Sequence, residues 1–336
     1  MSDTFLDDIL EKFGDEVLIT DSSDIIPIST GSISLDASIG IGGIPRGRIT
    51  EIFGSEGTGK TTMALGMTRY ALSHGNKALY IDAENMLDYK LINMIVGEYI
   101  DAEKLVILNP QSAEDAFEMA EVGIKSGEFA LVVLDSIGAL APQKEKDDDF
   151  AKANVALTAR LVTKFLRRIS YEVKNTNTAL VLLNQVRDKI GSFIGGYDTP
   201  GGHALKHFTA LRIALTRGKK IEVKKGKEKT VVGVEVNFNV RKNKLAPPFR
   251  GFHFPIMFGV GIDTPMDYLE YCTMLGIIKK SGAFYKFEGE TLGQGKLAAA
   301  KTLSEDKLAL DKIQEMVYNI LEIKVNSEDI EEDVSE

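Results

Sequence analysis

One segment of the 336-residue chain, from Gly54 to Thr61, matches the pattern G-x-x-x-x-G-K-[ST]. It follows the apolar run ITEIF and opens a stretch with helical periodicity. Glycines let such a loop wrap closely round phosphate, whose charge is attracted by backbone N–H groups and the helix N-terminus. Lys60 is predicted to reach the β- and γ-phosphates of a nucleotide, and Thr61 to ligate Mg²⁺. The predicted phosphate-binding residues are Gly54, Ser55, Glu56, Gly57, Thr58, Gly59, Lys60, Thr61 and Thr62.

Two neighbouring apolar runs end in acidic side chains that could complete a nucleotide site. Asp135 ends LVVLD, as expected of the acid that organises Mg²⁺ beside a phosphate loop. Glu84 lies just beyond ALYID, where it could orient or deprotonate the water that attacks the γ-phosphate. Parallel sheets bind ligands at the edge where their strands end. The alternative for Glu84 is a helix N-cap, a role that Asp82 or Asp88 could also fill.

A polar pair, Asn184-Gln185, ends a further apolar run and precedes a long irregular segment. The amide of Gln185 could sense the γ-phosphate. The segment from Val186 to Gly202, VRDKIGSFIGGYDTPGG, is rich in glycine and has no regular periodicity. Such long loops in compact domains are usually functional or disordered. An amide that contacts the nucleotide and leads into this loop could act as a switch, and a plain surface loop is the alternative.

Strand and helix patterns alternate around these residues and predict a parallel sheet covered on both faces. Strands are expected at 49–53, 78–82, 105–108, 130–135 and 179–184. Helices are expected at 60–73, 87–98, 112–126 and 151–174. After residue 205 the chain becomes strand-rich, and runs at 209–216, 231–240 and 252–258 predict an antiparallel extension of the same sheet.

The two ends of the chain differ from this central region. Residues 5–18 predict a short amphipathic helix, which is marginal alone and must pack on something. Residues from 263 onward predict a small, mostly helical module. Residues 327–336 hold six acids and no base, so we expect a disordered acidic tail.

Composition restricts the class of protein but leaves its partner open. Charged residues make up 26% of the chain, and no apolar run approaches the roughly 18 residues that span a bilayer, as in soluble globular proteins. The single cysteine, Cys272, cannot form an internal disulfide, so a reducing cytoplasm is expected. The net charge of −9 disfavours nucleic acid, but it averages over the acidic tail and a basic turn, residues 217–229, that has seven bases and two acids.

These motifs, in this order, resemble the bacterial RecA recombinase family. The resemblance runs from about residue 28 to 297 and rests on ISTGSISLDASIGIGGIPRGRITEIFG, GSEGTGKTT, YIDAENMLD, VVLDSIGAL, LLNQVRDKIG, GGHALK, VRKNKLAPPF and FGVGI. It implies an α/β fold: a P-loop NTPase core with a mostly parallel central sheet, a short N-terminal polymerisation arm and a small C-terminal α+β domain. The expected boundaries are 1–30 for the arm, 31–260 for the core, 261–326 for the C-terminal domain and 327–336 for the tail.

The resemblance also implies roles in ATP hydrolysis, with ATP and Mg²⁺ as cofactors. Glu84 would be the general base and Gln185 the γ-phosphate sensor. Lys242 and Lys244 would reach the ATP of a neighbouring subunit and neutralise charge on the transferring phosphoryl, as an arginine finger does. Two further residues would join the ATP site: Asp88, and Phe258 where an aromatic ring stacks on adenine.

For DNA, the resemblance implies a DNA-dependent ATPase of recombination and repair. It would polymerise head to tail into a helical filament on single-stranded DNA and exchange strands with homologous duplex DNA. Two loops would contact DNA, one near 143–155 and one at 186–202. The implied DNA-binding residues are Arg160, Arg167, Arg187, Lys189, Ile190, Gly201 and Gly202. Single-strand-binding and mediator proteins would be further partners, and no membrane is involved.

The chain departs from the family pattern in several places. The first DNA loop reads QKEKDDDFAKANV, which has an acidic centre. His207 stands where the family usually has phenylalanine at the subunit contact. Around Asn237 and Asn239 the chain lacks basic residues that the family uses as a secondary DNA site. We therefore hypothesise that the basic turn 217–229 captures the incoming duplex instead.

Three other functions share some of these motifs. A ring-forming helicase or RadA-like branch-migration motor uses the same core, but the zinc segment of RadA-like proteins is excluded by the single cysteine. A non-catalytic ATP-binding regulator would not need Lys60, Thr61, Glu84 and Asp135 together. A small-molecule kinase would have an acceptor pocket and an ATPase activity that ignores DNA.

Overall fold

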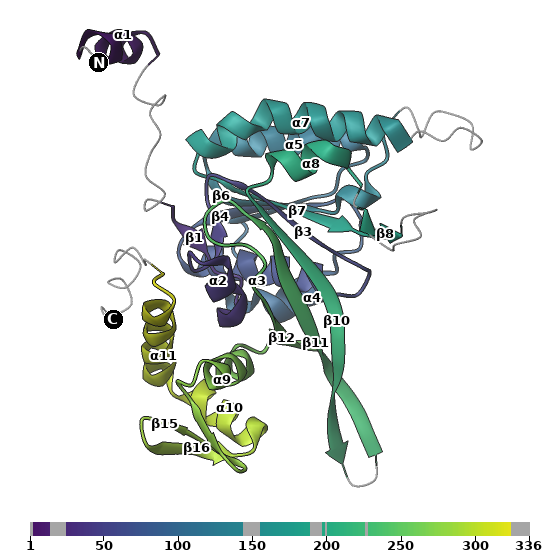
Figure 1. Cartoon of the computed structure of the whole chain (residues 1–336). Coiled ribbons are helices and arrows are strands. Elements are labelled where there is room, and N and C mark those ends of the chain that lie inside the picture. Colours follow the sequence, from purple (N-terminus) through teal and green to yellow (C-terminus); the bar gives the residue numbers. More distant parts are fainter. Residues whose placement is uncertain are drawn as a thin grey trace.

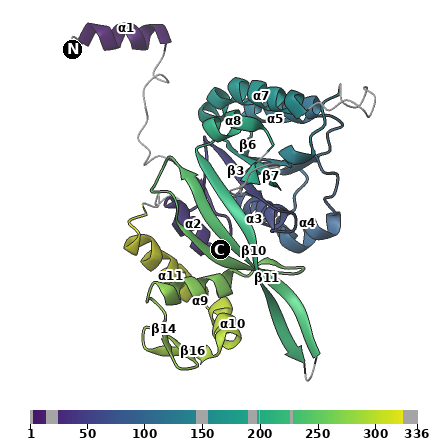
Figure 2. The same ribbon diagram turned by 45° about the vertical axis from the view of Figure 1, so that its right-hand side comes forward.

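The computed structural model describes residues 3–13, 25–143, 155–188, 197–198, 200–225 and 228–323. Within these ranges no helix combines the length and the apolar character needed to cross a bilayer. The helix expected at 5–18 is α1 (Asp3–Phe13), and residues 14–24 lie outside the described part. Figures 1 and 2 both place α1 apart from the rest of the chain.

A nine-stranded sheet in the order β13-β12-β11-β10-β3-β7-β6-β4-β5 forms the core of the molecule. Its parallel part consists of β3 (Ile49–Gly54), β4 (Lys77–Asp82), β5 (Leu105–Leu108), β6 (Phe129–Asp135) and β7 (Ala179–Gln185). β10 (Leu211–Lys225) continues it in parallel with β3. β11 (Glu228–Asn243), β12 (Gly251–Met257) and β13 (Gly261–Ile262) then add antiparallel strands. The mixed sheet predicted from the sequence is confirmed, except that its extension begins with a strand parallel to β3.

Helices cover both faces of this sheet, as Figure 1 shows. On one face lie α2 (Ile33–Ile39), α3 (Lys60–Ser73) and α4 (Tyr89–Ile95), whose apolar side chains share a cluster with Ile52 and Val181. On the other lie α5 (Ala113–Ser126), α7 (Val155–Asn175) and α8 (Gly202–Phe208), packed on Leu180 and Leu182. Successive residues of a strand point to opposite faces, which is why the buried strands read as continuous apolar runs.

Some expected boundaries differ from the structure. The helix expected at 87–98 ends at Ile95 and is followed by a 3₁₀ turn, η3 (Gly97–Tyr99). Gly97 adopts φ 64°, a left-handed conformation that an α-helix does not continue through. The helix expected at 151–174 is described from Val155 to Asn175. Short elements complete the core: β1 (Pro27–Ile28), β2 (Ile44–Pro45), η4 (Ile137–Ala139), β8 (Arg187–Asp188) and β9 (Tyr197–Asp198).

The segment interpreted as a basic turn at 217–229 is mostly strand, and that interpretation was wrong. β10 and β11 remain paired as far as Lys225 and Glu228, and only residues 226–227 between them lie outside the described part. The two strands form a ribbon that projects well beyond the sheet (Figures 1 and 2). The alternation of Ile221 and Val223 with charged residues continues the strand pattern, but the flanking lysines hid it. We call residues 217–229 the basic ribbon.

A third apolar cluster forms the interior of the C-terminal domain and also includes Ile33 and Ala37 of α2. Three helices, α9 (Thr264–Met274), α10 (Lys296–Glu305) and α11 (Lys307–Ile320), pack with a three-stranded antiparallel sheet. The strands are β14 (Lys279–Ser281), β15 (Phe284–Phe287) and β16 (Glu290–Gln294). The domain is therefore α+β, as the family resemblance implied, and most of its regular structure is helical, as the sequence pattern predicted.

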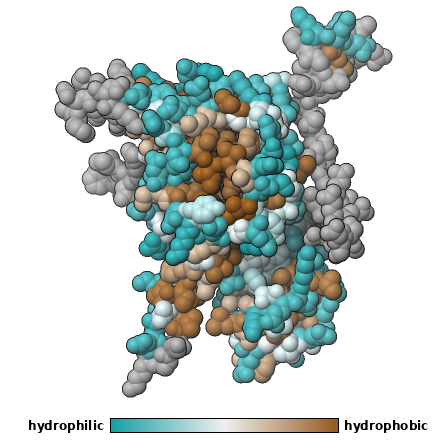
Figure 3. All heavy atoms as spheres, turned by 180° about the vertical axis from the view of Figure 1, so that it is seen from behind, coloured by the Kyte–Doolittle hydropathy of each residue, from teal (hydrophilic) through white to brown (hydrophobic). Residues whose placement is uncertain are grey.

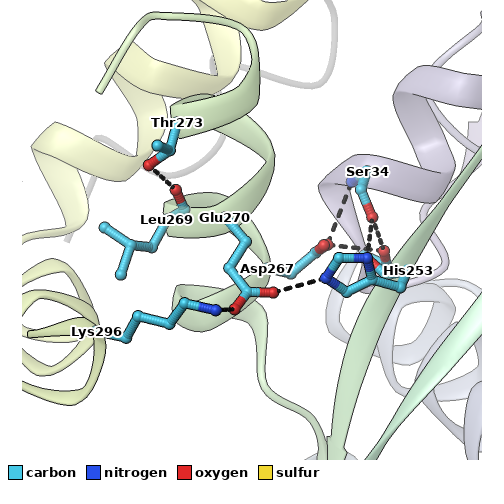
Figure 4. Close-up of polar contacts among 8 residues, drawn as sticks. Ser34, His253, Asp267, Leu269, Glu270, Thr273 and Lys296 are labelled. Atoms are coloured by element: carbon cyan, nitrogen blue, oxygen red, sulfur yellow. Dashed lines mark hydrogen bonds and ion pairs between the residues drawn. The ribbon is translucent and has the colours of Figure 1, made fainter. Parts of the chain in front are cut away.

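Polar contacts join this domain to the core, as Figure 4 shows. His253 on β12 bonds Glu270 on α9 at 2.9 Å, and the same carboxylate takes an ion pair from Lys296 on α10. Asp267 on α9 accepts hydrogen bonds from the Ser32 hydroxyl at 2.7 Å and the Ser34 backbone N–H at 3.2 Å. Core strand, core helix and C-terminal helices are thus fixed to one another by buried and half-buried charges.

Because of these buried groups, we expect the unfolding free energy to fall as pH rises from about 4 to about 7. Burial raises the pKa of Asp36 to about 7 and that of Asp267 to about 6, and the bond from Glu270 raises the pKa of His253. The folded chain holds these protons more tightly than the unfolded chain, so their stabilisation is full below the unfolded pKa and is lost as pH rises through the folded pKa. The loss is roughly 1.4 kcal/mol for each pKa unit between the two states.

Urea denaturation between pH 4.5 and 8 measures this slope. The variants Asp36→Asn and Asp267→Asn should each flatten it. An unfolding free energy that rose steadily to pH 8 in the original chain would contradict the expectation.

Candidate functional site

The glycine-rich loop leads from β3 into α3, so its backbone N–H groups and the helix N-terminus face the same space. Gly59 is the N-cap of α3 and adopts φ 81°, a left-handed conformation that favours glycine. A Cβ at Gly59 would also lie 2.3 Å from Ile256 Cδ1. The left-handed backbone therefore favours glycine at this position, and any side chain there would also displace Ile256.

Lys60 lies at the centre of the loop and is only 8% exposed. Its ammonium donates hydrogen bonds to the carbonyl oxygens of Gly54 (3.1 Å) and Ser55 (2.9 Å). Burial lowers its pKa, and the carboxylates of Asp135 and Glu84 oppose that effect. The arrangement holds one partly desolvated positive charge where the loop would enclose phosphate.

Asp135, at the end of β6, accepts hydrogen bonds from two hydroxyl groups on one carboxylate oxygen. Thr61 Oγ1 donates to its Oδ2 at 2.8 Å, and Tyr80 donates to the same oxygen at 2.7 Å. Burial raises the pKa of Asp135, while the bonds from Tyr80 and Thr61 act in the opposite direction. A hydroxyl and a carboxylate oxygen this close together are the hard oxygen ligands that Mg²⁺ prefers.

Glu84 points toward the same edge of the sheet rather than capping a helix. Ser136 Oγ donates to Glu84 Oε1 at 2.5 Å, and Gln185 Nε2 donates to it at 3.0 Å. Strands β4, β6 and β7 are neighbours in parallel register, with Asp82 opposite Asp135, which brings these side chains to one edge. The peptide bond from Asp135 to Ser136 is cis.

Of the two other acids considered from the sequence, Asp88 has the capping role and Asp82 holds a turn. Asp88 caps α4 by accepting from the Lys90 N–H at 3.0 Å. Asp82 accepts from the Glu84 N–H at 3.1 Å and the Leu87 N–H at 2.9 Å, and so shapes the turn that carries Glu84. The carboxylate of Glu84 is therefore available for chemistry at the strand ends.

Three residues of the site had no recognised signal in the sequence. Tyr80 and Ser136 contact the two acids directly, and Arg217 Nη2 donates to the carbonyl of Gly57 at 3.2 Å. Tyr80 shares a strand face with Asp82, a spacing that could have indicated it. Arg217 comes from β10, far along the chain, and no local pattern predicts its position on the loop.

A basic face on α7 follows the phosphate site in the chain. An open hollow of about 540 Å³ is lined by Arg160, Thr163, Lys164, Arg167 and other α7 residues. Arg168 on this helix is paired with Glu121, at 2.6 Å. The spacing of Arg160, Lys164 and Arg167 places their charges along one side of a helix.

The predicted DNA loops are described only in part. Residues 144–154 of the first loop, and Lys189 and Ile190 of the second, lie outside the described part. Arg187 lies in β8, which pairs with β9. Gly201 adopts φ 99° as the N-cap of α8, and Gly202 is the first residue of that helix. The two glycines thus form the tight turn at the end of the second loop.

Comparison with known families identifies this combination of core and site. The model of the RecA N-terminal domain matches residues 2–263, and that of the RecA C-terminal domain matches residues 266–322. The chain belongs to the RecA family. It is 44% identical to Protein RecA of Aquifex aeolicus (strain VF5) over 291 residues, which cover 86% of this chain and 82% of the relative. Protein RecA of Aquifex pyrophilus is 40% identical over 320 residues, 94% of this chain and 90% of the relative. Protein RecA of Thermus aquaticus is 41% identical over 296 residues, 88% of this chain and 84% of the relative.

Membership of the RecA family establishes the general activity of this chain. The chain is a DNA-dependent ATPase that exchanges DNA strands in recombination and repair. The α/β fold with a small C-terminal domain agrees with this assignment. The helicase, regulator and kinase alternatives are thereby set aside.

The lysines that the RecA resemblance places across a subunit boundary have contacts within their own chain. Lys242 Nζ donates to the carbonyl oxygens of Lys206 (2.7 Å) and His207 (3.2 Å) at the end of α8. Burial lowers the pKa of Lys242, and the nearby charges of Lys244 and Arg212 act in the same direction. Lys244 is exposed. Phe258, after β12, is 61% exposed, so its ring surface is open to a ligand.

Proposed function

We propose that this RecA-family chain binds ATP with Mg²⁺ at the junction of two protomers and uses it to control a filament on DNA. The contact between Gln185 and Glu84 carries the proposal. It joins a carboxylate placed to activate water to an amide whose chain continues into the 186–202 segment. The residue that contacts Glu84 therefore directly precedes the proposed DNA loop.

Each polar group at the strand ends has a task in this scheme. Lys60 and the backbone of the loop would hold the phosphates, and Glu84 would orient the attacking water and accept its proton. Ser136 and Gln185 keep Glu84 in position through their hydrogen bonds. Thr61 and Asp135 would hold Mg²⁺, which when bound draws charge from the transferring phosphoryl group. Asp88 and Phe258 would lie toward the adenine.

Assembly would complete the site from the next protomer. Lys242 and Lys244 would supply positive charge to the transferring phosphoryl of that neighbour. Lys242 would leave the carbonyl groups of α8 for the phosphate, so nucleotide binding and the position of α8 would be linked. Contacts of this head-to-tail kind produce open helical filaments rather than closed pairs.

An apolar surface on the core domain supports the proposal that α1 packs on an adjacent copy of the chain. Seen from behind, apolar side chains gather in the middle of the core domain (Figure 3). Independently of that view, β5 is an edge strand of the sheet, and its residues Val106, Ile107 and Leu108 are only half-buried. Patches of this kind mark interaction sites. The helix α1 of an adjacent copy is amphipathic and has the length to cover such a surface.

Single-stranded DNA would contact the basic face of α7 and the 186–202 segment. Arg160 and Arg167 would bind phosphates, and Arg187, Lys189, Ile190, Gly201 and Gly202 would approach the strand. Phosphate contacts give affinity that falls with salt and little sequence preference. Homology is then tested by base pairing. We place the protein in the cytoplasm, where it would meet single-strand-binding and mediator proteins on the same DNA.

Phosphate release with and without single-stranded DNA tests the proposed function. We expect hydrolysis to depend strongly on DNA and to rise cooperatively with protein concentration. Electron microscopy with a slowly hydrolysed ATP analogue should show extended filaments rather than rings. Full-speed hydrolysis by a monomer that is indifferent to oligonucleotide would overturn the proposal.

The basic ribbon is the part of this scheme that the RecA pattern does not supply. Lys219 and Lys220 are exposed, and Lys224 lies directly opposite Lys229 in the strand register. Lys229 also forms an ion pair with Glu222, at 3.1 Å, so Lys219 and Lys220 supply positive charge that this pair does not neutralise. A two-stranded ribbon also fits the major groove of duplex DNA. We propose that the ribbon captures the incoming duplex, in place of the basic side chains absent at Asn237 and Asn239.

Neutralising four lysines of the ribbon, Lys219, Lys220, Lys224 and Lys225, to glutamine should weaken duplex uptake roughly tenfold at fixed salt. Single-stranded DNA binding should change much less, because other surfaces provide it. Fluorescence anisotropy with labelled duplex and single strands, on filaments already formed, measures both.

A matched control changes four lysines elsewhere to glutamine: Lys77, Lys104, Lys125 and Lys174. It alters the net charge by the same amount, so it should leave duplex uptake nearly unchanged. Equal losses for duplex and single strand in the ribbon variant, or no loss in either, would remove the ribbon from this role.

A further inference from the structure

A closed set of polar contacts connects the end of β7 with the turn that precedes α8. Asn184 Nδ2 donates to Glu51 Oε1 and to the carbonyl of Pro200, both at 2.9 Å. Asn184 Oδ1 accepts from the backbone N–H of Gln185 at 3.0 Å. Arg212 Nε donates to Glu51 Oε2 at 2.5 Å. Both N–H donors of the Asn184 amide and its oxygen are therefore used.

These groups are buried, so their contacts depend on one another. The side chains of Glu51 and Asn184 are wholly inaccessible to solvent. A buried carboxylate is very costly unless it is paired, and Arg212 provides that pair from the neighbouring strand. Arg212 also stacks over the ring of Phe53, with its Cζ 4.7 Å from the centroid. Removing one member leaves its partner unsatisfied, which makes the set behave as a unit.

The position of Asn184 in the chain connects this network to the phosphate site at one end and to α8 at the other. It precedes Gln185, whose side chain bonds Glu84, and the next N–H, that of Val186, bonds the Gly54 carbonyl of the phosphate loop at 3.3 Å. At the far end, the Pro200 carbonyl immediately precedes the Gly201-Gly202 turn into α8. The same amide thus bonds the beginning and the end of the segment between residues 185 and 200.

We propose that Asn184, held by Glu51 and Arg212, is the positioning residue that makes the two ends of the 186–199 segment move together. The inference rests on the proposed function, in which Gln185 responds to the nucleotide and this segment contacts DNA. A shift of Gln185 displaces the backbone N–H that Asn184 accepts. The Asn184 amide transmits this displacement to Pro200 and the start of α8. In this scheme Asn184, Glu51 and Arg212 do not touch the reacting atoms.

The test compares DNA affinity in the presence of ADP and of a non-hydrolysable ATP analogue. In Asn184→Asp both amide donors are lost and a second carboxylate faces Glu51. We expect the ratio of the two DNA dissociation constants to fall about fivefold or more from that of the original chain. Nucleotide affinity without DNA should stay within about twofold, because the phosphate loop is intact. A network with a merely structural role would lower the unfolding temperature and leave the ratio unchanged.

Asn76→Asp is the matched control. Asn76 is an amide at the opposite edge of the sheet, where its Nδ2 bonds the His74 carbonyl. This variant should keep the original ratio. An Asn184→Asp protein that folds and retains the full ratio, or an equal loss in the control, would overturn the inference.

Hydrogen exchange on the unmodified chain provides a second test that needs no folded variant. Replacing ADP with the ATP analogue should change amide exchange both near Gln185 and in the first turn of α8, and to a similar extent. A change at one end alone would overturn the inference. DNA-stimulated ATP hydrolysis by the unmodified chain remains the separate test of the proposed function, so failure of one is distinguishable from failure of the other.

Discussion

Replacing Glu84 with glutamine should reduce DNA-stimulated ATP hydrolysis about 100- to 10,000-fold, the usual contribution of a general base. Glutamine preserves the acceptor oxygen that Ser136 and Gln185 contact, so the local geometry should survive. The variant lacks the carboxylate that would take a proton from the attacking water. Binding of ATP and nucleotide-dependent binding of single-stranded DNA should persist. Phosphate release and fluorescence anisotropy measure the two properties.

The control for this prediction is Glu315→Gln on the exposed side of α11. It makes the same chemical change far from the strand ends and should leave hydrolysis unaffected. A Glu84→Gln protein that retained more than about a tenth of the original rate would show that another group activates the water.

The double variant Lys242→Ala, Lys244→Ala should lower DNA-stimulated hydrolysis about 1,000-fold or more, as loss of an arginine finger does. Each protomer of the variant should still bind ATP, because its own phosphate loop is unchanged. The two lysines act only on the ATP of the neighbouring protomer. Loss of Lys242 also removes the contact with the end of α8, so DNA affinity in ADP should be measured alongside. The variant Lys279→Ala, Lys286→Ala removes two exposed lysines of the C-terminal domain and serves as the control.

Mixing experiments separate a shared site from a damaged protomer. Lys60→Ala lacks a working phosphate loop but retains the lysines, and the double lysine variant has the reverse defect. In random head-to-tail filaments of equal amounts, about a quarter of the interfaces combine two intact halves. Hydrolysis should therefore reappear in the mixture although each variant alone is inactive. No recovery, with filaments present, would contradict a site built from two protomers.

The residues of the phosphate site were predictable because each lies where a buried strand ends. A strand flanked by helices places its final polar residue at the edge shared with its neighbours. Lys60, Thr61, Glu84, Asp135 and Gln185 all follow apolar runs that the sequence makes plain. Their roles in this chain stay predictions, but the structure brings them together at one edge of the sheet.

Strand and helix positions were predictable for the same local reason. Helix α3 was expected at 60–73 and is found at Lys60–Ser73, and β5 was expected and found at Leu105–Leu108. The basic ribbon was not recognised, because lysines interrupt its apolar alternation and only cross-strand pairing makes it extended. Local propensity indicates strands less well where both faces are solvated.

The sequence by itself therefore determined the family, the phosphate loop and the acids at the strand ends, because these depend on local pattern and order. Only the tertiary structure decided which side chains meet. It placed Arg217 on the carbonyl of Gly57, Lys242 on the end of α8 and Asn184 between Glu51 and Pro200. These contacts join residues far apart in the chain, and they depend on strand register and burial rather than on neighbouring sequence.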